Sequence, residues 1–417
     1  MTEAVLGIDI GTSGVRVVAR SIDGVLLAMA AAPLPKSDGS LQDPALWWDA
    51  VASAFSRLNL QSIQILALAI DGTSGTILPI DAAGKPLALA SMYNDVADPA
   101  HVTRIKQAAP PETAAHGATS PLARAIARQS GAARILHQAD WLLGKFCGRF
   151  DVSDENNALK SGYDPVKRQW PAWLADVGMK AALLPDVVPA GTRVGNILPD
   201  VAKAFGLPQD VAIVAGTTDG CAGFLASGAS QAGDGATSLG TTLTLKLLSA
   251  NPVFAPAYGI YSHRIGDQWL AGGASNSGGV VLAQAFSKDE IIRLSALIDP
   301  AVETGLDYYP LPKAGERFPV NDINRAPRMT PRPLRDEIYL QAILEGIAEI
   351  EALGYRRLAE LGASPLISIR SAGGGAANDT WTAIRLRKLK VPVLPSASEH
   401  AAMGTARLAW RGIGYDA

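Results

Sequence analysis

Two short β-rich runs near the start of the chain are separated by a glycine turn, and this arrangement constrains the fold most. Residues 4–10 read AVLGIDI, residues 15–20 read VRVVAR, and residues 11–14 (GTSG) lie between them. Aliphatic runs on either side of a glycine turn are typical of a β-hairpin. Glycine lets the backbone turn tightly and approach an anion, and Thr12 and Ser13 add hydroxyl and N–H donors. The sequence therefore predicts a hairpin whose turn can bind phosphate.

The same pattern occurs again in the second half of the chain. Residues 237–248 (TSLGTTLTLKLL) place a Gly-Thr-Thr turn before an alternating strand. A third glycine-rich segment, residues 372–378 (AGGGAAN), follows a predicted strand at 366–371 and precedes a helix that opens at residue 379. There the backbone can lie close against a nucleotide, and the helix N-terminus favours negative charge.

Strand and helix patterns alternate along the rest of the chain. Residues 63–70 (IQILALAI) and 211–215 (VAIVA) are continuous apolar runs, which fit strands buried on both faces. Residues 44–58 have the spacing of an amphipathic helix, with Asp43 as candidate N-cap. Residues 335–362 carry the clearest helical stripe, whereas residues 299–334 are rich in proline and aromatic residues and are expected to be irregular. This mixed order predicts the α/β class.

Composition excludes several classes of protein. The chain has 417 residues, enough for two or three domains. Lysine and arginine total 37 against 39 acidic residues, so no basic excess exists to bind nucleic acid. The two cysteines, Cys147 and Cys221, are far apart, which fits a reducing compartment. Because no signal peptide or membrane-length apolar run is found, we expect a soluble cytoplasmic protein that does not contact a membrane.

The phosphate-binding motifs of other nucleotide proteins are absent from the sequence. It has no G-x-x-x-x-G-K-[ST], and its glycine spacing does not give G-x-G-x-x-G after the first strand. The order of its own turns is more informative. A phosphate hairpin in each half and a glycine-rich loop near the end are similar to the paired ATPase domains of actin, the Hsp70 chaperones and sugar kinases.

Within that group the residues resemble the FGGY carbohydrate kinases, and in particular a short pentulose-kinase branch described as xylulose-kinase-like or D-ribulose kinases. The matching segments extend over nearly the whole chain. They are 9–13 (DIGTS) with Arg16, 215–220 (AGTTDG), 238–242 (SLGTT), 344–348 (LEGIA), 372–378 (AGGGAAN) and 402–406 (AMGTA). Residues 70–76 (IDGTSGT) and 305–312 (GLDYYPLP) support the branch.

This resemblance implies two actin-like, ribonuclease H-like ATPase domains with an interdomain active-site cleft. The N-terminal domain is expected at residues 1–226, with residues 400–417 returning to it. It would bind the sugar and carry the catalytic base. The C-terminal domain is expected at residues 227–399 and would bind ATP.

The resemblance also assigns roles to two aspartates. Asp219 matches the catalytic base, which accepts the proton of a sugar hydroxyl as that oxygen attacks the γ-phosphorus. Asp9 matches the aspartate associated with Mg²⁺, and both aspartates are candidate ligands of that ion and candidate contacts of the substrate. Two structural interpretations remain open, because Asp219 also suits a helix N-cap and Asp9 suits a turn.

The remaining candidates divide between nucleotide and sugar. The nucleotide group is Gly11, Thr12, Gly240, Thr241, Thr242, Gly374, Gly375 and Asn378. Asn378 is equally suited to be only a helix N-cap. The sugar group is Asp9, Thr12, Ser13, Ser74 and Asp219. Five histidines, His101, His116, His137, His263 and His400, show no metal-ligand spacing and are expected to be structural or on the surface.

Departures from the family pattern lie around the predicted sugar pocket. Many xylulose kinases have a Met-His pair where this chain has residues 73–75 (TSG). The smaller, neutral Ser74 favours a pentulose other than D-xylulose, although Ser74 also suits a turn. Asn94 and Asp95 are kept from a family run whose Trp and Arg are lost. Arg124 stands where the family has lysine, and whether these three residues contact the sugar stays open.

These features together predict an ATP- and Mg²⁺-dependent kinase that converts D-ribulose to D-ribulose 5-phosphate. D-xylulose is the alternative substrate for the same residues. A rival from another class is an ATP-dependent actin-fold switch or sugar sensor with little turnover. The expected partner is a small-molecule sugar, with no nucleic acid and no membrane, and the chain is expected to be a monomer or homodimer.

Overall fold

The computed structural model describes residues 1–35 and 39–415, which form two compact units. The first unit contains Met1–Ala226, His263–Gly266 and the described part of His400–Ala417. The second contains Ser227–Ser262 and Asp267–Glu399. These units differ from the expected domains only in residues 263–266, which were expected in the second domain and belong to the first unit. The last two residues of the expected 400–417 segment lie outside the described residues. Among the described helices, none is long and apolar enough to cross a bilayer.

The main sheet of the first unit runs in the order β11-β12-β5-β1-β2-β3. Strands β12, β5 and β1 are parallel, and β1, β2 and β3 follow as an antiparallel meander. Their bounds are β1 Thr2–Ile10, β2 Gly14–Arg20, β3 Leu26–Pro33, β5 Ile63–Gly72, β11 Arg193–Asn196 and β12 Ala212–Thr218. The β1–β2 hairpin confirms the one expected from the first 20 residues.

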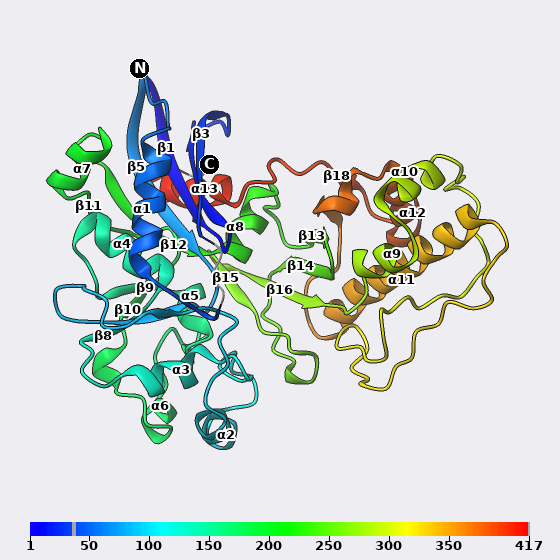
Figure 1. The fold of residues 1–417 in the computed structure, drawn as a ribbon, viewed down its shortest axis with the longest axis horizontal. Coiled ribbons are helices and arrows are strands. Elements are labelled where there is room, and N and C mark those ends of the chain that lie inside the picture. The colour runs from blue at the N-terminus through cyan, green and yellow to red at the C-terminus, as the bar shows by residue number, and fades with distance from the viewer. Residues whose placement is uncertain (36–38, 416–417) are drawn as a thin grey trace. The chain divides into compact units, whose positions relative to one another are not determined.

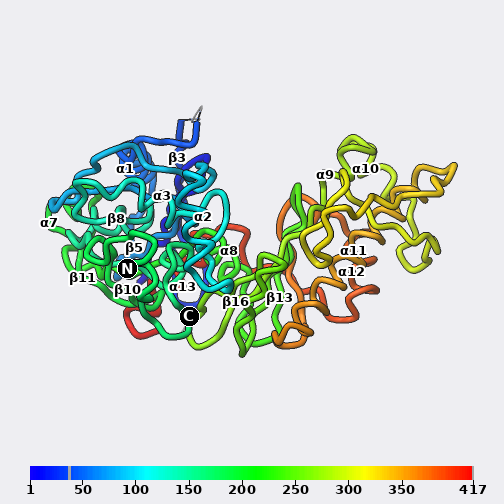
Figure 2. The backbone as a smooth tube through the Cα atoms, turned by 90° about the horizontal axis from the view of Figure 1, so that it is seen from below, coloured from blue at the N-terminus to red at the C-terminus, as the bar shows by residue number. Residues whose placement is uncertain are grey.

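Both faces of this sheet are covered, which is why its central strands are continuous apolar runs. Alternate side chains of β1, such as Leu6 and Ile8, join the core beneath α1 (Pro44–Phe55) and α4 (Gln138–Cys147). The opposite face, with Val5, packs on α8 (Asp219–Ala226) and α13 (Ala401–Arg411). Helix α13, red in Figures 1 and 2, therefore lies among the blue and green elements of the first unit.

Shorter elements complete the first unit around a second small sheet, in the order β4-β7-β6-β8. The strands of this part are β4 Leu41–Gln42, β6 Ile77–Ile80, β7 Ala90–Ser91, β8 Arg134–His137, β9 Val152–Asp154 and β10 Asp186–Val188. The segment 263–266 of the first unit contains β15 His263–Ile265, which is not a strand of this small sheet. The helices are α2 Pro99–Ala108, α3 Pro121–Arg128, α5 Glu155–Leu159, α6 Trp173–Asp176, η1 Ala181–Leu183 and α7 Pro199–Phe205. Helices α2 and α3 pack on this part through a core of their own.

The sheet of the second unit repeats the topology of the first. Strands β18, β17 and β13 are parallel, and they correspond to β12, β5 and β1 of the first sheet. Strands β13, β14 and β16 are antiparallel, and they correspond to β1, β2 and β3. The bounds are β13 Asp234–Leu239, β14 Leu243–Ser249, β16 Gln268–Ala274, β17 Ser368–Ala372 and β18 Val393–Leu394. The two phosphate-type turns, 11–13 and 240–242, thus occupy equivalent places in the two sheets.

Helices pack on this second sheet around a single apolar core. They are η2 Pro256–Tyr258, α9 Gly279–Ala285, α10 Lys288–Ser295, α11 Asp336–Glu360, η3 Gly374–Ala377 and α12 Asp379–Leu389. The segment between α10 and α11 contains no helix or named strand among its residues, all of which are described, as its proline content predicted.

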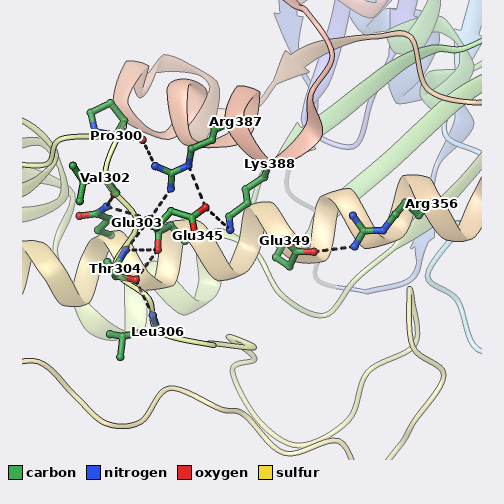
Figure 3. Close-up of polar contacts among 11 residues, drawn as sticks. Pro300, Val302, Glu303, Thr304, Leu306, Glu345, Glu349, Arg356, Arg387 and Lys388 are labelled. Carbon is green, nitrogen blue, oxygen red and sulfur yellow. Dashed lines mark hydrogen bonds and ion pairs between the residues drawn. The ribbon is translucent and has the colours of Figure 1, made fainter.

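The irregular segment is fastened to α11 by buried Glu345 (Figure 3). The Thr304 hydroxyl donates to Glu345 Oε2 at 2.6 Å, and Arg387 of α12 donates to Oε1 at 2.8 Å. Next to it, a Cβ on Gly346 would come within 2.7 Å of Pro310 Cδ and 2.9 Å of the Tyr308 carbonyl oxygen. The LEG part of the 344–348 motif therefore docks the irregular segment on α11.

Candidate active site

Three aspartates gather at the carboxyl ends of three neighbouring parallel strands. Asp9 is the penultimate residue of β1 and the register partner of Asp71 on β5. Asp71 is in turn the partner of Thr217 on β12, and Asp219 follows two residues later as the first residue of α8. Carboxyl ends of parallel strands are the usual place for ligands in α/β sheets. The sheet therefore brings together Asp9 and Asp219, which the sequence predicted, and adds Asp71, which it did not.

The three carboxyls perturb one another. Burial raises the pKa of Asp9, and the charge of Asp219 adds to that rise. Opposing effects on Asp9 come from a hydrogen bond with Asp71 and from the charges of Arg16, at 3.8 Å, and His400. The pKa of Asp71 is raised well above its usual range, first by complete burial and then by the charge of Asp9. Asp71 is thus the group of this cluster that most favours the protonated form.

Asp71 is also the most enclosed of the three. The Thr405 hydroxyl of α13 donates to Asp71 Oδ2, so the 402–406 motif supplies a contact to the cluster. Asp71 Oδ1 is buried and accepts no hydrogen bond from any described residue. A protonated Oδ1 can instead donate to Asp9, consistent with the hydrogen bond that lowers the pKa of Asp9. Asp71 can therefore hold the Asp9 carboxylate in place by donating a hydrogen bond to it from the neighbouring strand.

Asp219 is half-buried at the start of α8, so its carboxyl is not enclosed by the core. Its Oδ1 accepts the N–H of Gly220 at 2.6 Å. The hydroxyl of the preceding residue, Thr218, accepts the N–H of Cys221 at 3.4 Å. Thr218 thus makes the contact that a helix N-cap makes, which weighs against capping as the main role of Asp219.

The turn between β1 and β2 presents its side chains outward. Thr12 and Ser13 are exposed, and the N–H of Gly11 donates to the carbonyl of Gly14 at 3.0 Å. Ser13 fixes its end of the turn by accepting the N–H of Leu34 on its backbone carbonyl at 3.0 Å. The hydroxyls of Thr12 and Ser13 can therefore bind a ligand without disturbing the hairpin.

The turn after β5 contains the predicted sugar contact Ser74. Within residues 71–80 Ser74 alone is not buried. Thr73 is fixed by Gln138, whose Oε1 accepts the Thr73 N–H at 3.0 Å and its hydroxyl at 2.8 Å. The Thr76 hydroxyl accepts the N–H of Tyr93 at 3.1 Å. Ser74 thus lies on a hydrogen-bonded turn in the segment that follows Asp71.

The second unit contains a large cavity next to its phosphate-type turn. Its volume is about 1110 Å³. Five predicted nucleotide residues line it: Gly240, Thr241, Gly374, Gly375 and Asn378. Thr242 is not among the lining residues but is exposed on the same turn. Apolar side chains that the sequence analysis missed form much of the wall, namely Val280, Leu282, Phe286, Ile291, Ile292 and Trp381.

Asn378 is the N-cap of α12 and also lines the cavity. Its Oδ1 accepts the N–H of Trp381 at 2.9 Å and caps α12. Its Nδ2 donates to the Ser295 hydroxyl at 2.9 Å, which ties α12 to α10 across the cavity wall. The residue that caps α12 therefore also holds two helices of the cavity wall together.

The turn 240–242 is held in place by the start of α9. The N–H of Gly279 donates to the Gly240 carbonyl at 2.9 Å, and the N–H of Val280 donates to the Thr241 carbonyl at 3.0 Å. A Cβ on Gly279 would lie 2.8 Å from the Gly240 oxygen, so only glycine permits this approach. The carbonyls of Gly240 and Thr241 are thereby occupied, and the N–H groups and hydroxyls of the turn are the groups suited to an anion.

The aspartate cluster suits a Mg²⁺ ion that arrives with a nucleotide. Mg²⁺ prefers carboxylate oxygens and is commonly held by one or two carboxylates together with substrate phosphates. Asp9 and Asp219 offer such oxygens, and their mutual repulsion would be relieved by a cation. Among the described residues, no group of three or more His, Cys, Asp or Glu side chains is arranged so that it could hold a metal ion by itself.

Comparison with known families identifies both units. Residues 123–226 match the N-terminal domain model of the FGGY family of carbohydrate kinases, and residues 235–413 match its C-terminal domain model.

Curated relatives are similar over most of their length. Xylulose kinase of Escherichia coli (strain K12) is 28% identical over 410 residues, covering 90% of this chain and 83% of the relative. Autoinducer-2 kinase of Yersinia enterocolitica is 26% identical over 469 residues, covering 99% and 87%.

The solved structure of xylulose kinase from Rhodospirillum rubrum superposes with a TM-score of 0.86 at 20% identity, covering 99% of this chain and 91% of that one. At this identity the likeness shows the fold alone. It confirms the α/β class and the two-domain, actin-like ATPase architecture expected from the sequence.

Proposed function

Because the chain belongs to the FGGY family of carbohydrate kinases, we propose that it transfers the γ-phosphoryl group of ATP to a pentulose, and that this pentulose is D-ribulose. The observation that carries the proposal is the position of Asp219. Its half-buried carboxyl stands at the strand ends beside Asp9 and Asp71, and Thr218 makes the capping contact. A carboxylate placed in this way is suited to accept a proton from a hydroxyl.

In the proposed reaction Asp219 takes the proton from the primary hydroxyl at C5 of the sugar. The C5 oxygen forms a bond to the γ-phosphorus as the bond from that phosphorus to the bridging oxygen of ADP breaks. Charge develops on the phosphoryl oxygens, so donors that are already in place lower the barrier. We assign this task to the N–H groups and hydroxyls of the two turns, 11–13 and 240–242.

We assign the nucleotide to the cavity of the second unit and the sugar to the first unit. Gly240, Thr241, Gly374, Gly375 and Asn378 would surround the adenosine and phosphates, with Thr242 beside them. Mg²⁺, held by Asp9 and Asp219, would neutralise phosphate charge when bound.

The choice of D-ribulose rests on the turn after β5. D-ribulose and D-xylulose differ only in configuration at C3, so one hydrogen-bonding side chain can separate them. Ser74 is the half-buried residue of that turn and offers a small hydroxyl. D-xylulose remains the second candidate, because relatives named xylulose kinase match the chain over most of its length.

The test is Mg²⁺-dependent ADP release with D-ribulose, L-ribulose, D-xylulose, L-xylulose, ribitol, glycerol and no sugar. We expect D-ribulose to give the highest kcat/KM, and Asp219→Asn to lower the sugar-dependent rate by roughly 10²- to 10⁴-fold. Asp176→Asn, a change at an exposed carboxyl on α6, serves as the control.

Each other outcome has a distinct meaning. A preference for D-xylulose would keep the kinase assignment and overturn the inference from Ser74. If no sugar raised ADP release above the sugar-free rate, the switch or sensor class would replace the kinase proposal.

A further inference from the structure

Arg124 of α3 is a buried cation that contacts three separate segments of the first unit. Its side chain is 3% exposed. The guanidinium donates to the carbonyl oxygens of Gly75 at 2.6 Å, Ser91 at 2.9 Å and Met92 at 2.9 Å. It also donates to the Ser91 hydroxyl at 2.7 Å and to the carbonyl of Thr119 at 3.2 Å. All of these acceptors are uncharged oxygens.

Keeping a charge in this position is costly. Burial lowers the pKa of Arg124 to about 10, which still leaves it protonated at neutral pH. The carboxyl of Asp95 offsets part of that effect through its charge, but the hydrogen bonds that hold it come from the hydroxyls of Ser40 and Ser91. A buried cation whose direct acceptors are main-chain carbonyls is better explained by the segments it joins than by an ion pair.

The segment joined most closely is the turn that carries Ser74. Arg124 holds the carbonyl of Gly75, directly after Ser74, and Gln138 holds Thr73, directly before it. The carbonyls of Ser91 and Met92 come from the start of the 91–95 loop, which also contributes the N–H of Tyr93 to Thr76. The two loops are therefore joined by the guanidinium of Arg124 and by the hydrogen bond from Tyr93 to Thr76.

We propose that Arg124 is a positioning residue for the sugar, which fixes the Ser74 turn against the 91–95 loop through the Gly75 carbonyl. This inference rests on the proposed function, because Ser74 is assigned there to the pentulose. In this proposal Arg124 does not touch the sugar. The sequence had left open whether it does. The planar fork of arginine reaches several carbonyls at once, whereas the single ammonium of lysine cannot span them in the same geometry.

The experiment compares Arg124→Lys with Arg128→Lys in the full-length protein. Arg128 lies one turn further along α3, is more exposed, and donates to the Leu89 carbonyl at 3.1 Å and lies 3.7 Å from Asp95. We expect Arg124→Lys to raise the KM for the preferred sugar roughly tenfold to a hundredfold, because small displacements of a binding group are costly. The KM for ATP should stay unchanged, and Arg128→Lys should leave both values near those of the wild type.

A double mutant separates positioning from general loss of structure. If Arg124 acts through Ser74, then Arg124→Lys added to Ser74→Ala should raise the sugar KM less than it does alone. Equal effects in the two backgrounds would overturn the proposal, as would an unchanged sugar KM in Arg124→Lys. A loss of kcat and melting temperature without a change in sugar KM would assign Arg124 a structural role only. A wild-type protein that no sugar stimulates would instead overturn the proposed function, and this inference with it.

Discussion

Asp9 and Asp71 lie opposite each other on neighbouring parallel strands, and both have a raised pKa. Of the two, Asp71 is fully buried and Asp9 retains partial exposure and a nearby cation, Arg16. Their environments therefore divide the roles. Asp71 favours the protonated form inside the sheet, and Asp9 presents its carboxylate at the surface of the cluster.

Replacement of Asp71 by asparagine should change how stability depends on pH. The pKa of Asp71 is raised in the folded protein, so above pH about 4 the unfolded chain releases a proton that the folded chain keeps. The free energy of unfolding therefore falls as pH rises, by up to about 1.4 kcal/mol per pH unit from this group. Asp71→Asn should flatten that fall, measured by urea unfolding between pH 4 and 7.

Asp154 provides an internal reference for that experiment. Burial raises the pKa of Asp154 to about 7. Asp154 therefore also makes the free energy of unfolding fall as pH rises, in the wild type and in Asp71→Asn alike. Asp176→Asn, at an exposed carboxyl, should leave the pH profile as it is in the wild type. An Asp71→Asn profile parallel to that of the wild type would contradict the assignment.

Substitution of two adjacent glycines should separate nucleotide binding from stability. No atom lies within 4 Å of a Cβ built on Gly374, which lines the cavity, whereas a Cβ on Gly375 would meet the Trp381 ring at 2.4 Å. We expect Gly374→Val to raise the KM for ATP roughly tenfold or more by occupying ligand space, with little change in melting temperature. Gly375→Ala should lower stability by about 1–3 kcal/mol through overpacking. If Gly374→Val instead lowered the melting temperature and left the KM for ATP unchanged, the assignment of the nucleotide to this cavity would be wrong.

The buried ion pair of the second unit should be costly to break. Arg385 and Glu351 are fully buried, and Arg385 Nε lies 2.7 Å from Glu351 Oε2. Arg385→Met leaves that carboxylate without its cation, so the free energy of unfolding should drop by about 3–5 kcal/mol. Arg149→Met breaks a pair that is 45% and 44% exposed and should cost less than about 1 kcal/mol. Similar losses for both variants in chemical denaturation would be inconsistent with this account.

Loss of the Glu345 charge should loosen the irregular segment locally. Glu345→Gln weakens the contacts to Thr304 and Arg387 drawn in Figure 3. The amides of residues 302–306 should exchange hydrogen faster, with a loss of about 1–3 kcal/mol, typical of a bond to a buried charged group. Glu349→Gln, on the same helix in an exposed pair with Arg356, is the matched control and should leave exchange there unaltered.

Much of the local structure followed from the sequence because local chemistry determines it. The Asp43-Pro44 start of α1 is confirmed, with Asp43 accepting the N–H of Ala45 at 2.9 Å, although the helix ends at Phe55 and not at residue 58. The glycine turns after β1 and β13 were recognisable because each lies directly between two aliphatic strand runs.

The missing parts of the site arise from long-range pairing. Asp71 appeared only inside the 70–76 segment that supports the branch and was given no role at the site, since nothing in its neighbourhood says that β5 lies between β1 and β12. His400 was expected to be structural or on the surface, and the return of α13 to the first sheet brings it near enough to Asp9 to lower the pKa of that carboxyl. The apolar wall of the cavity, such as Phe286 and Trp381, has the same composition as a core and carries no separate signal.

The return of α13 also sets an order of events during synthesis. One face of the first sheet, including Val5 and Ala69, finds its cover in α13, which is made only after the whole second unit. While the ribosome is still translating residues 227–399, that face has no helix α13 to pack on. The nascent chain must therefore carry exposed apolar surface for that period, and a chaperone that shields such surface is expected to engage the first unit until the last helix arrives.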